Sequence, residues 1–169
     1  MAALTTVAVA LAPASGSARQ SQATASGLVA AYAFSEGSGT TVADLSGNGN
    51  NGTVSNATWT TAGKFGNALV FNGTSARVNV PDSSSLDLTT GMTLEAWVNP
   101  TTVSAVWRDV VYKGNDSYYL EGTSGNAGVP AGGGTFGGSG GNVYGTSVIP
   151  TGNVWTFLAL TYDGATLRL

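Results

Sequence analysis

The chain contains no cysteine and no histidine among its 169 residues. The first absence excludes disulfide bonds and thiol nucleophiles, and the second excludes Ser-His-Asp triads and the commonest transition-metal ligand. A bound metal ion would have to be held by oxygen atoms, which favours calcium over zinc. The missing cysteines do not decide the cellular compartment, because a domain of this size folds without disulfides.

Charged side chains are also scarce, at 9% of the residues against about 25% in an ordinary soluble domain. Coiled coils and helical bundles need many Glu, Lys and Arg residues at helical spacing, so both classes are excluded. Six basic residues face nine acidic ones, which excludes nucleic-acid binding through a basic surface. The four Trp, six Tyr and five Phe residues exclude a disordered chain, and the length favours one domain.

The first 26 residues differ in composition from the rest of the chain. Ala2 to Ala14 is a run of small and apolar residues, and the small residues that follow suit cleavage by signal peptidase. The run is too short for a membrane span, which needs about 20 apolar residues. No Lys or Arg precedes it, so an unstructured tail is the alternative. We expect a leader or tail over residues 1–26, a domain over residues 27–169, and a secreted or cell-surface protein without a membrane span.

From residue 27 onward, apolar residues recur with a period of two, which predicts strands. Met92 to Val98 alternates in this way, whereas Val154 to Tyr162 is apolar on both faces and is expected to be a central, buried strand. Asn51-Gly52, Asn72-Gly73 and Asp163-Gly164 are turn signals. Many short strands separated by turns predict an all-β, antiparallel β-sandwich.

Two segments depart from this pattern. Gly122 to Gly145 carries eleven glycines, and glycine has no side chain to bury. We expect a long loop or a loose hairpin there, with Phe136 and Tyr144 as anchors. The last residues, Leu167 to Leu169, read as the beginning of a strand. The domain is therefore expected to be truncated at its C-terminus.

Ordered sequence blocks across residues 27–169 resemble a laminin-G-like jelly-roll domain of the concanavalin A-like lectin/glucanase superfamily. The blocks are Gly27–Phe34, Glu36–Gly39, Asp44–Gly52, Gly66–Gly73, Met92–Val98 and Trp155–Gly164. The resemblance implies a two-sheet antiparallel jelly-roll β-sandwich, in which roughly the last quarter of the family's pattern is missing here. It also implies calcium binding near the Asp44 block.

The segment Asp44–Gly52 is the strongest local candidate for a metal site. It combines one carboxylate with several amide oxygens, and its glycines allow a tight backbone, which is chemistry suited to Ca²⁺. One carboxylate makes a weak site, so a second acidic residue is needed. We predict a structural Ca²⁺ site formed by Asp44, Asn48, Asn50 and Asp163, with Glu36 as another candidate for the second carboxylate. The alternative is a structural turn held by Asx hydrogen bonds.

Catalysis by this chain is not expected. Retaining glycoside hydrolases need two carboxyl groups about 5–5.5 Å apart, close to the i, i+2 spacing on one strand. Glu95 has Thr93 and Trp97 at these positions, and Asp109 likewise has no acidic neighbour two residues away. Glu95 is therefore expected to be a lone strand residue.

Sugar binding is chemically plausible, because sugars stack on exposed aromatic rings while polar groups hold their hydroxyls. Trp97, Trp155 and Phe157 are expected in the core, where most aromatic residues of a β-sandwich lie. The candidate ligand-binding residues are Trp107, Tyr112, Asn115, Asp116, Tyr118 and Tyr144.

We predict an extracellular, non-catalytic recognition module that binds glycans and is stabilised by calcium. One alternative is a structural or adhesive spacer that binds protein partners, and another is an accessory domain of a larger secreted hydrolase. Exposed aromatic residues on one face would favour the recognition module. Burial of all the aromatic residues would favour the spacer.

Overall fold

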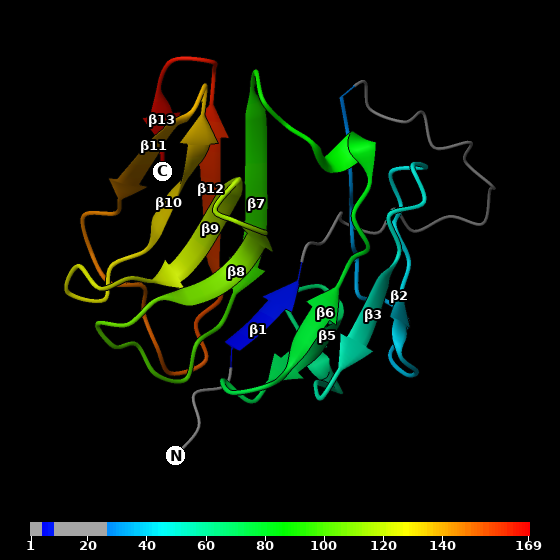
Figure 1. Cartoon of the computed structure of the whole chain (residues 1–169). Helices are drawn as coiled ribbons and strands as arrows, with labels where there is room; N and C mark the ends of the chain where they lie inside the picture. Colours follow the sequence, from blue (N-terminus) through cyan, green and yellow to red (C-terminus); the bar gives the residue numbers. More distant parts are fainter. Residues whose placement is uncertain (1–4, 9–26) are drawn as a thin grey trace.

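The computed structural model describes residues 5–8 and 27–169, where every paired strand is antiparallel and no α-helix occurs (Figure 1). The all-β prediction is confirmed. The described residues contain no helix long and apolar enough to cross a membrane. Apart from residues 5–8, the segment 1–26 expected to be a leader lies outside the described residues.

The strands form three sheets. The six-stranded sheet has the order β13 (Leu167–Arg168), β12 (Thr156–Tyr162), β7 (Met92–Val98), β1 (Thr5–Ala8), β5 (Gly66–Phe71) and β4 (Thr58–Gly63). The four-stranded sheet has the order β11 (Ser139–Tyr144), β10 (Ala131–Phe136), β9 (Tyr118–Thr123) and β8 (Arg108–Lys113). The three-stranded sheet has the order β2 (Thr41–Val42), β3 (Gly52–Ser55) and β6 (Arg77–Asn79), and the 3₁₀ helix η1 spans Ser84–Leu86.

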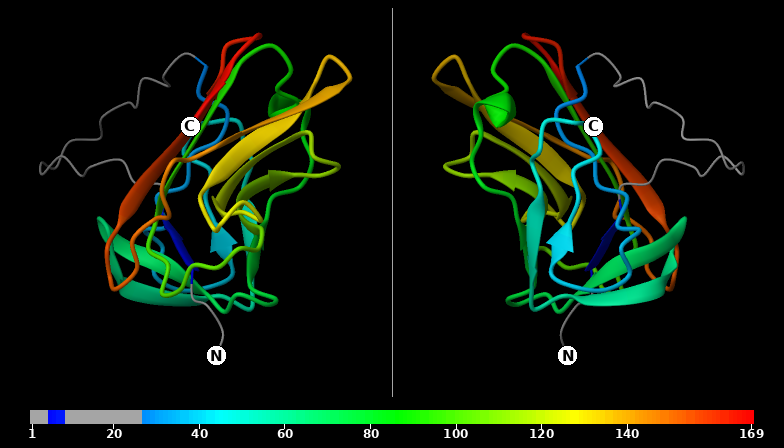
Figure 2. Two further views of the ribbon diagram at one scale, coloured as in Figure 1. Left: turned by 90° about the vertical axis from the view of Figure 1, so that its left-hand side faces the viewer. Right: turned by 90° about the vertical axis from the view of Figure 1, so that its right-hand side faces the viewer.

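The six-stranded and four-stranded sheets are the two layers of a jelly-roll sandwich, seen from the side in Figure 2. The predicted alternation of β7 is confirmed, since Met92, Leu94, Ala96 and Val98 are all buried. They pack with residues of β9 and β12, including the fully buried Leu160. Each large side chain buried in this way contributes about 1.5–3 kcal/mol relative to an exposed position.

A second core cluster lies between the three-stranded sheet and β5. Val42 of β2, Val54 of β3 and Leu69 of β5 are buried there together with Phe34. Trp155 packs, partly buried, against the same cluster. Strand β1 lies within the segment expected to be a leader and pairs with β5 on one side and β7 on the other. The backbone of β1 thus joins β5, which packs on the second cluster, to β7, which packs on the first.

The glycine-rich segment is a hairpin rather than a long loop. Strands β10 and β11 pair over their full length, and β10 also pairs with β9. Of the two predicted alternatives the hairpin is confirmed and the long loop is wrong, because glycine lets three strands come close together. A Cβ atom on Gly133 would lie 2.3 Å from the carbonyl oxygen of Gly141 and 2.7 Å from the hydroxyl of Tyr119. The anchoring role of Phe136 is confirmed, since its ring stacks on Tyr162 with the centroids 3.9 Å apart.

Strand β12 lies inside the sheet, between β7 and β13, but only one of its faces is covered. Leu158 and Leu160 are buried, whereas Phe157 on the other face is 47% exposed. Phe157 contacts Trp97, and Lys64 lies 4.5 Å from the centroid of a Trp97 ring. The prediction of a strand buried on both faces, with Phe157 in the core, is therefore wrong. No second layer of the described residues covers the outer face of β12.

Candidate functional site

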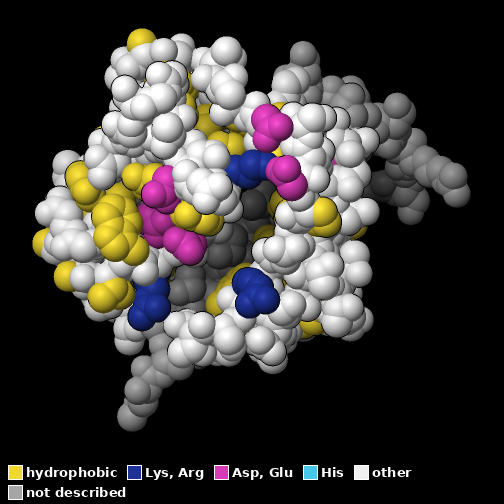
Figure 3. Space-filling view, viewed as in Figure 1, with side chains coloured by type: hydrophobic (Ala, Val, Ile, Leu, Met, Phe, Trp, Pro, Cys, Tyr) yellow, Lys and Arg dark blue, Asp and Glu magenta, His cyan; other side chains and the backbone are white. Residues whose placement is uncertain are grey.

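The outer face of the four-stranded sheet carries a pocket of about 330 Å³ between β8 and β9. In Figure 3, acidic side chains gather beside exposed hydrophobic ones over this part of the molecule. The volume lies at the lower end of the range of small-molecule sites, about 300–1,000 Å³. We call it the acidic aromatic pocket, and its lining residues are Trp107, Asp109, Tyr112, Asp116, Tyr119 and Glu121.

Irregular pairing of β8 with β9 places these residues on one face. Asp109 is opposite Glu121, whereas Tyr112 is opposite Tyr119, with a register shift between the two pairs. Residues three apart, such as Asp109 and Tyr112, lie on opposite faces of a regular strand. A β-bulge adds one residue to β8 and so turns both side chains to the same side.

Asp109, which is exposed, and Glu121, which is buried, form a pair of carboxyl groups in the lining of the pocket. Glu121 is only 3% exposed, and its Oε2 atom has no hydrogen-bond partner. Burial, followed by the hydrogen bond and negative charge of Asp109, raises the pKa of Glu121 to about 9. Glu121 is therefore protonated at neutral pH in the free protein, and the pair shares one proton.

Aromatic side chains surround this pair of carboxyl groups. Trp107 is 48% exposed and Tyr112 is 49% exposed, so both rings present accessible surface. Tyr119 meets Trp107 edge-on, with the ring centroids 6.3 Å apart at 89°. Tyr144 of β11 lies at the same distance from Trp107 on a tilted plane. Exposed rings beside polar groups are the combination found in sites that bind sugars or cations.

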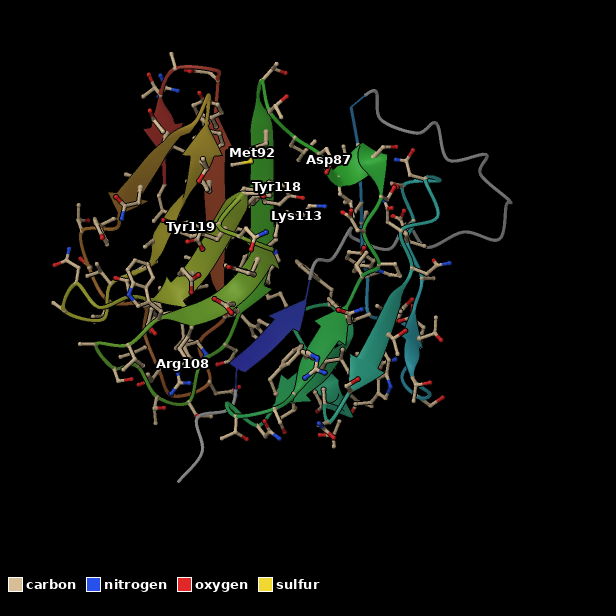
Figure 4. The ribbon with its side chains drawn as sticks, in the orientation of Figure 1. Asp87, Met92, Arg108, Lys113, Tyr118 and Tyr119 are labelled. Carbon is tan, nitrogen blue, oxygen red and sulfur yellow. The ribbon has the colours of Figure 1, made fainter. Side chains whose placement is uncertain are left out.

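Ionic and polar contacts anchor the two ends of β8. Lys113 extends toward η1, where it pairs with Asp82 and, at 3.4 Å, with Asp87 (Figure 4). Arg108, at the other end of the strand, donates a hydrogen bond of 3.2 Å to the carbonyl oxygen of Gly73. These contacts connect β8 to the loop between β5 and β6 and to the segments on either side of η1. The pocket is therefore built on an anchored strand.

The structure brings four of the six predicted ligand-binding residues together. Trp107, Tyr112 and Asp116 line the pocket, and Tyr144 contacts Trp107. Asn115 lies in the β8–β9 turn next to Asp116 and does not line the pocket. Tyr118 points to the opposite side of β9, where it is buried and its hydroxyl donates to the carbonyl oxygen of Leu86.

Sequence reasoning did not select Asp109 and Glu121 as ligand-binding residues. With regular pairing continued from Tyr112 and Tyr119, Asp109 would be opposite Gly122 instead of Glu121. The bulge that moves Asp109 has no signature in the strand's sequence. The Tyr118-Tyr119 pair did signal one inward and one outward ring, because neighbouring residues on a strand face opposite sides.

The predicted calcium ligand Asp44 is surrounded by hydrogen-bond donors. Its Oδ1 accepts from the backbone N–H groups of Ala31 and Ser46, and its Oδ2 accepts from the Ser46 hydroxyl and the N–H of Asn50. Burial works against ionisation, but the hydrogen bonds from Ser46, Ala31 and Asn50 outweigh it and lower the pKa of Asp44. Both oxygens are thus occupied by donors from the protein itself.

The side chains of Asn48 and Asn50 bond to the backbone and to Ser85, and Asp163 lies far from Asp44 (Figure 1). Asn48 and Asn50 use their amide nitrogens to donate to the carbonyl oxygen of Val29, and the Oδ1 of Asn50 accepts from Ser85. Asp163 lies in the β12–β13 turn, on the other side of the molecule in Figure 1, and pairs with Arg168. In this arrangement the residues do not fit a calcium ion, which takes 6–8 oxygen ligands. Within residues 27–169, no group of three or more acidic side chains could hold a metal.

The fold and the exposed pocket define a lectin-like binding domain. A family model described as the concanavalin A-like lectin/glucanases superfamily, of the laminin G type, matches residues 72–169. This is more than half of the chain, and the chain belongs to that family. No curated protein and no solved structure matches it. Laminin G-like domains generally bind partners and are typically extracellular.

Proposed function

We propose that this chain is a non-catalytic, extracellular recognition module that binds glycans in the acidic aromatic pocket. The observation that carries the proposal is the group of half-exposed rings, Trp107 and Tyr112, beside the carboxyl groups of Asp109, Asp116 and Glu121. The rings offer surface on which the apolar face of a sugar stacks, and the carboxyl groups accept hydrogen bonds from its hydroxyls. The volume of the pocket suits a short stretch of a glycan chain.

The contact between Asp109 and Glu121 supports a binding role over hydrolysis. Glycoside hydrolases keep their two carboxyl groups about 5 Å or more apart, because the scissile bond or a water molecule must lie between them. Here Asp109 is directly opposite Glu121 on the neighbouring strand and close enough to raise the pKa of its carboxyl group. Incubation of the protein with polysaccharides, followed by a reducing-end assay, is expected to release no sugar. Release that is lost in Glu121→Gln would contradict the non-catalytic proposal.

The binding proposal is tested by affinity electrophoresis of residues 1–169 in gels that contain soluble polysaccharides. Trp107→Ala is compared with Phe157→Ala, because the two rings are 48% and 47% exposed but lie on opposite faces of the sandwich. Loss of one stacking ring is expected to weaken retention about 2- to 12-fold, corresponding to about 0.5–1.5 kcal/mol. Phe157→Ala is expected to be retained like the unaltered protein. Equal retention of both variants, or no retention of any polysaccharide, would contradict the proposal.

A second candidate function is adhesion to a protein partner. It is favoured by the outer face of the six-stranded sheet, where Phe65 and Phe157 are 43% and 47% exposed on either side of Trp97. Exposed aromatic clusters of this kind occur in protein interfaces. Binding to an extracellular protein that is lost in Phe157→Ala and kept in Trp107→Ala would favour this function.

A further inference from the structure

The lining of the acidic aromatic pocket contains only two kinds of side chain. Three are aromatic and three carry carboxyl groups, and no Lys or Arg is among them. Arg108 neighbours Asp109 in sequence, but its guanidinium is bonded to Gly73 and lines a different hollow. No basic side chain of the lining therefore compensates the negative charge of the pocket.

The Glu121 carboxyl group is the strongest sign that a ligand with donors belongs here. It is 97% buried, as its 3% exposure shows, it lines the pocket, and its Oε2 has no hydrogen-bond partner. A buried acceptor without a partner costs about 1–3 kcal/mol, and more when it is charged. The groups that act on this carboxyl are the side chains of Asp109 and Asp116, which supply no positive charge, and the backbone N–H of Arg108.

The aromatic part of the lining favours a positive charge as well. A cation is attracted to the face of an aromatic ring, most strongly to tryptophan. Trp107 and Tyr112 each expose about half of their surface beside the carboxyl groups. An ammonium group combines a positive charge with three N–H donors, whereas a sugar hydroxyl has one donor and no charge.

We propose that the acidic aromatic pocket selects amino sugars whose amine is free and protonated. The ammonium group donates to Asp109 and Glu121 and lies against the ring of Trp107. The inference rests on the proposed glycan binding and names the class of glycan, namely hexosamine polymers that are not acetylated. Acetylation removes the charge of the amine and adds bulk, and a neutral sugar has no amine. Both classes of sugar are therefore expected to bind more weakly.

Binding of an ammonium group changes the protonation of the carboxyl pair. In the free protein the pair holds one proton, because the pKa of Glu121 is raised to about 9. The ammonium takes the place of this proton, so binding releases up to one proton to the solvent. The affinity for the amine is therefore expected to rise with pH while the amine keeps its own proton and to fall once the amine is deprotonated, whereas a neutral sugar shows neither change.

The test is isothermal titration calorimetry of residues 1–169 with three hexamers: β-1,4-linked glucosamine, its N-acetylated form, and β-1,4-linked glucose. The glucosamine hexamer is expected to bind about tenfold tighter than the other two at pH 7, as one charge-assisted hydrogen bond would produce. Titration in buffers with different ionisation enthalpies counts the protons released. Free lysine methyl ester serves as an amine without a sugar.

Variants separate the pocket from a general effect of charge. Asp109→Asn and Glu121→Gln are expected to lose the preference for the amine and the release of a proton. Glu95→Gln removes one negative charge from the exposed face of β7 and is expected to keep both. Thermal unfolding of each variant shows whether it is folded at the temperature of the titration.

The outcomes distinguish the inference from the proposed function. Equal affinity for all three hexamers, lost in Trp107→Ala, would overturn the amine selectivity and leave glycan binding intact. Binding of lysine methyl ester as tight as the glucosamine hexamer would support the ammonium pocket and overturn glycan binding. No binding of any ligand would overturn both proposals.

Discussion

Two acidic regions of this molecule show opposite hydrogen-bonding patterns. The carboxylate of Asp44 accepts four hydrogen bonds from its own loop and from Ala31. The carboxyl group of Glu121 is more deeply buried, yet one of its oxygens has no donor. Hydrogen bonds hold the pKa of Asp44 below its usual value, outweighing its burial, whereas burial and Asp109 hold that of Glu121 well above it.

The comparison separates a structural acid from one that is available to a ligand. A carboxylate saturated by backbone N–H groups stabilises its loop and has no lone pair left for a metal or a sugar. A buried carboxyl group with an oxygen that lacks a donor is destabilised as an anion and is stabilised by a proton or by a cationic ligand. The hydrogen-bond partners, rather than the acidic residue itself, thus indicate the role of each site.

The largest expected effect comes from removing the Asp44 carboxylate. Asp44→Ala leaves the backbone N–H groups of Ala31, Ser46 and Asn50 without their acceptor. We expect the free energy of unfolding to fall by about 2–4 kcal/mol, as for loss of several hydrogen bonds to a charged group. Urea denaturation at pH 7 measures this change.

The control is Asp163→Ala, because Asp163 accepts from two backbone N–H groups in an exposed turn. Its unfolding midpoint is expected to change less than that of Asp44→Ala. If the two variants lose the same stability, the saturated loop around Asp44 has no special structural role.

The next largest loss of stability is expected in the β10–β11 hairpin, which packs against Tyr119. In Gly133→Ala, the new methyl group would lie 2.3 Å from the backbone oxygen of Gly141, so β10 and β11 must move apart. Overpacking of this kind costs about 1–3 kcal/mol. Gly140→Ala is the matched control, since no atom lies within 4 Å of its added Cβ. Equal unfolding midpoints in urea for the two variants would show that close packing at Gly133 is not required.

For Glu121→Gln, the free energy of unfolding is expected to differ little from that of the unaltered protein at acidic pH. The difference is expected to grow as the pH rises. Between about pH 4.5 and pH 9 the folded protein holds a proton on Glu121 that the unfolded chain has released. The stability of the unaltered protein therefore falls as the pH rises through this range. Glutamine does not titrate, so the variant is expected to lose this dependence and to gain stability relative to the unaltered protein at pH 9. Parallel pH profiles of urea unfolding would contradict the raised pKa.

The smallest effect is expected from calcium. Because the oxygens of Asp44 are occupied, addition of calcium or of a chelator is expected to leave the thermal midpoint unchanged. A rise in the midpoint with calcium that is lost in Asp44→Asn would instead establish the calcium site expected from the sequence.

Local sequence patterns predicted much of the fold and only part of the site. The alternation from Met92 to Val98 predicted the strand and its buried face, because the period of two is a local property. Trp107, Tyr112 and Asp116 were identified because turns and strand edges expose aromatic and polar residues. Phe157 was expected in the core, since nothing in its own strand indicates that the outer face is uncovered.

The sequence by itself determined the all-β class, the positions of the main turns, and the block of Asp44 with its neighbouring asparagines. These features depend on residues close together in the chain. Only the tertiary structure decided that Asp109 is opposite Glu121, because a bulge in β8 shifts the register by one residue. It also decided that the Glu121 carboxyl group is buried with its Oε2 atom lacking a hydrogen-bond partner. Burial and pairing depend on residues brought together across strands, and no local pattern of side chains specifies them.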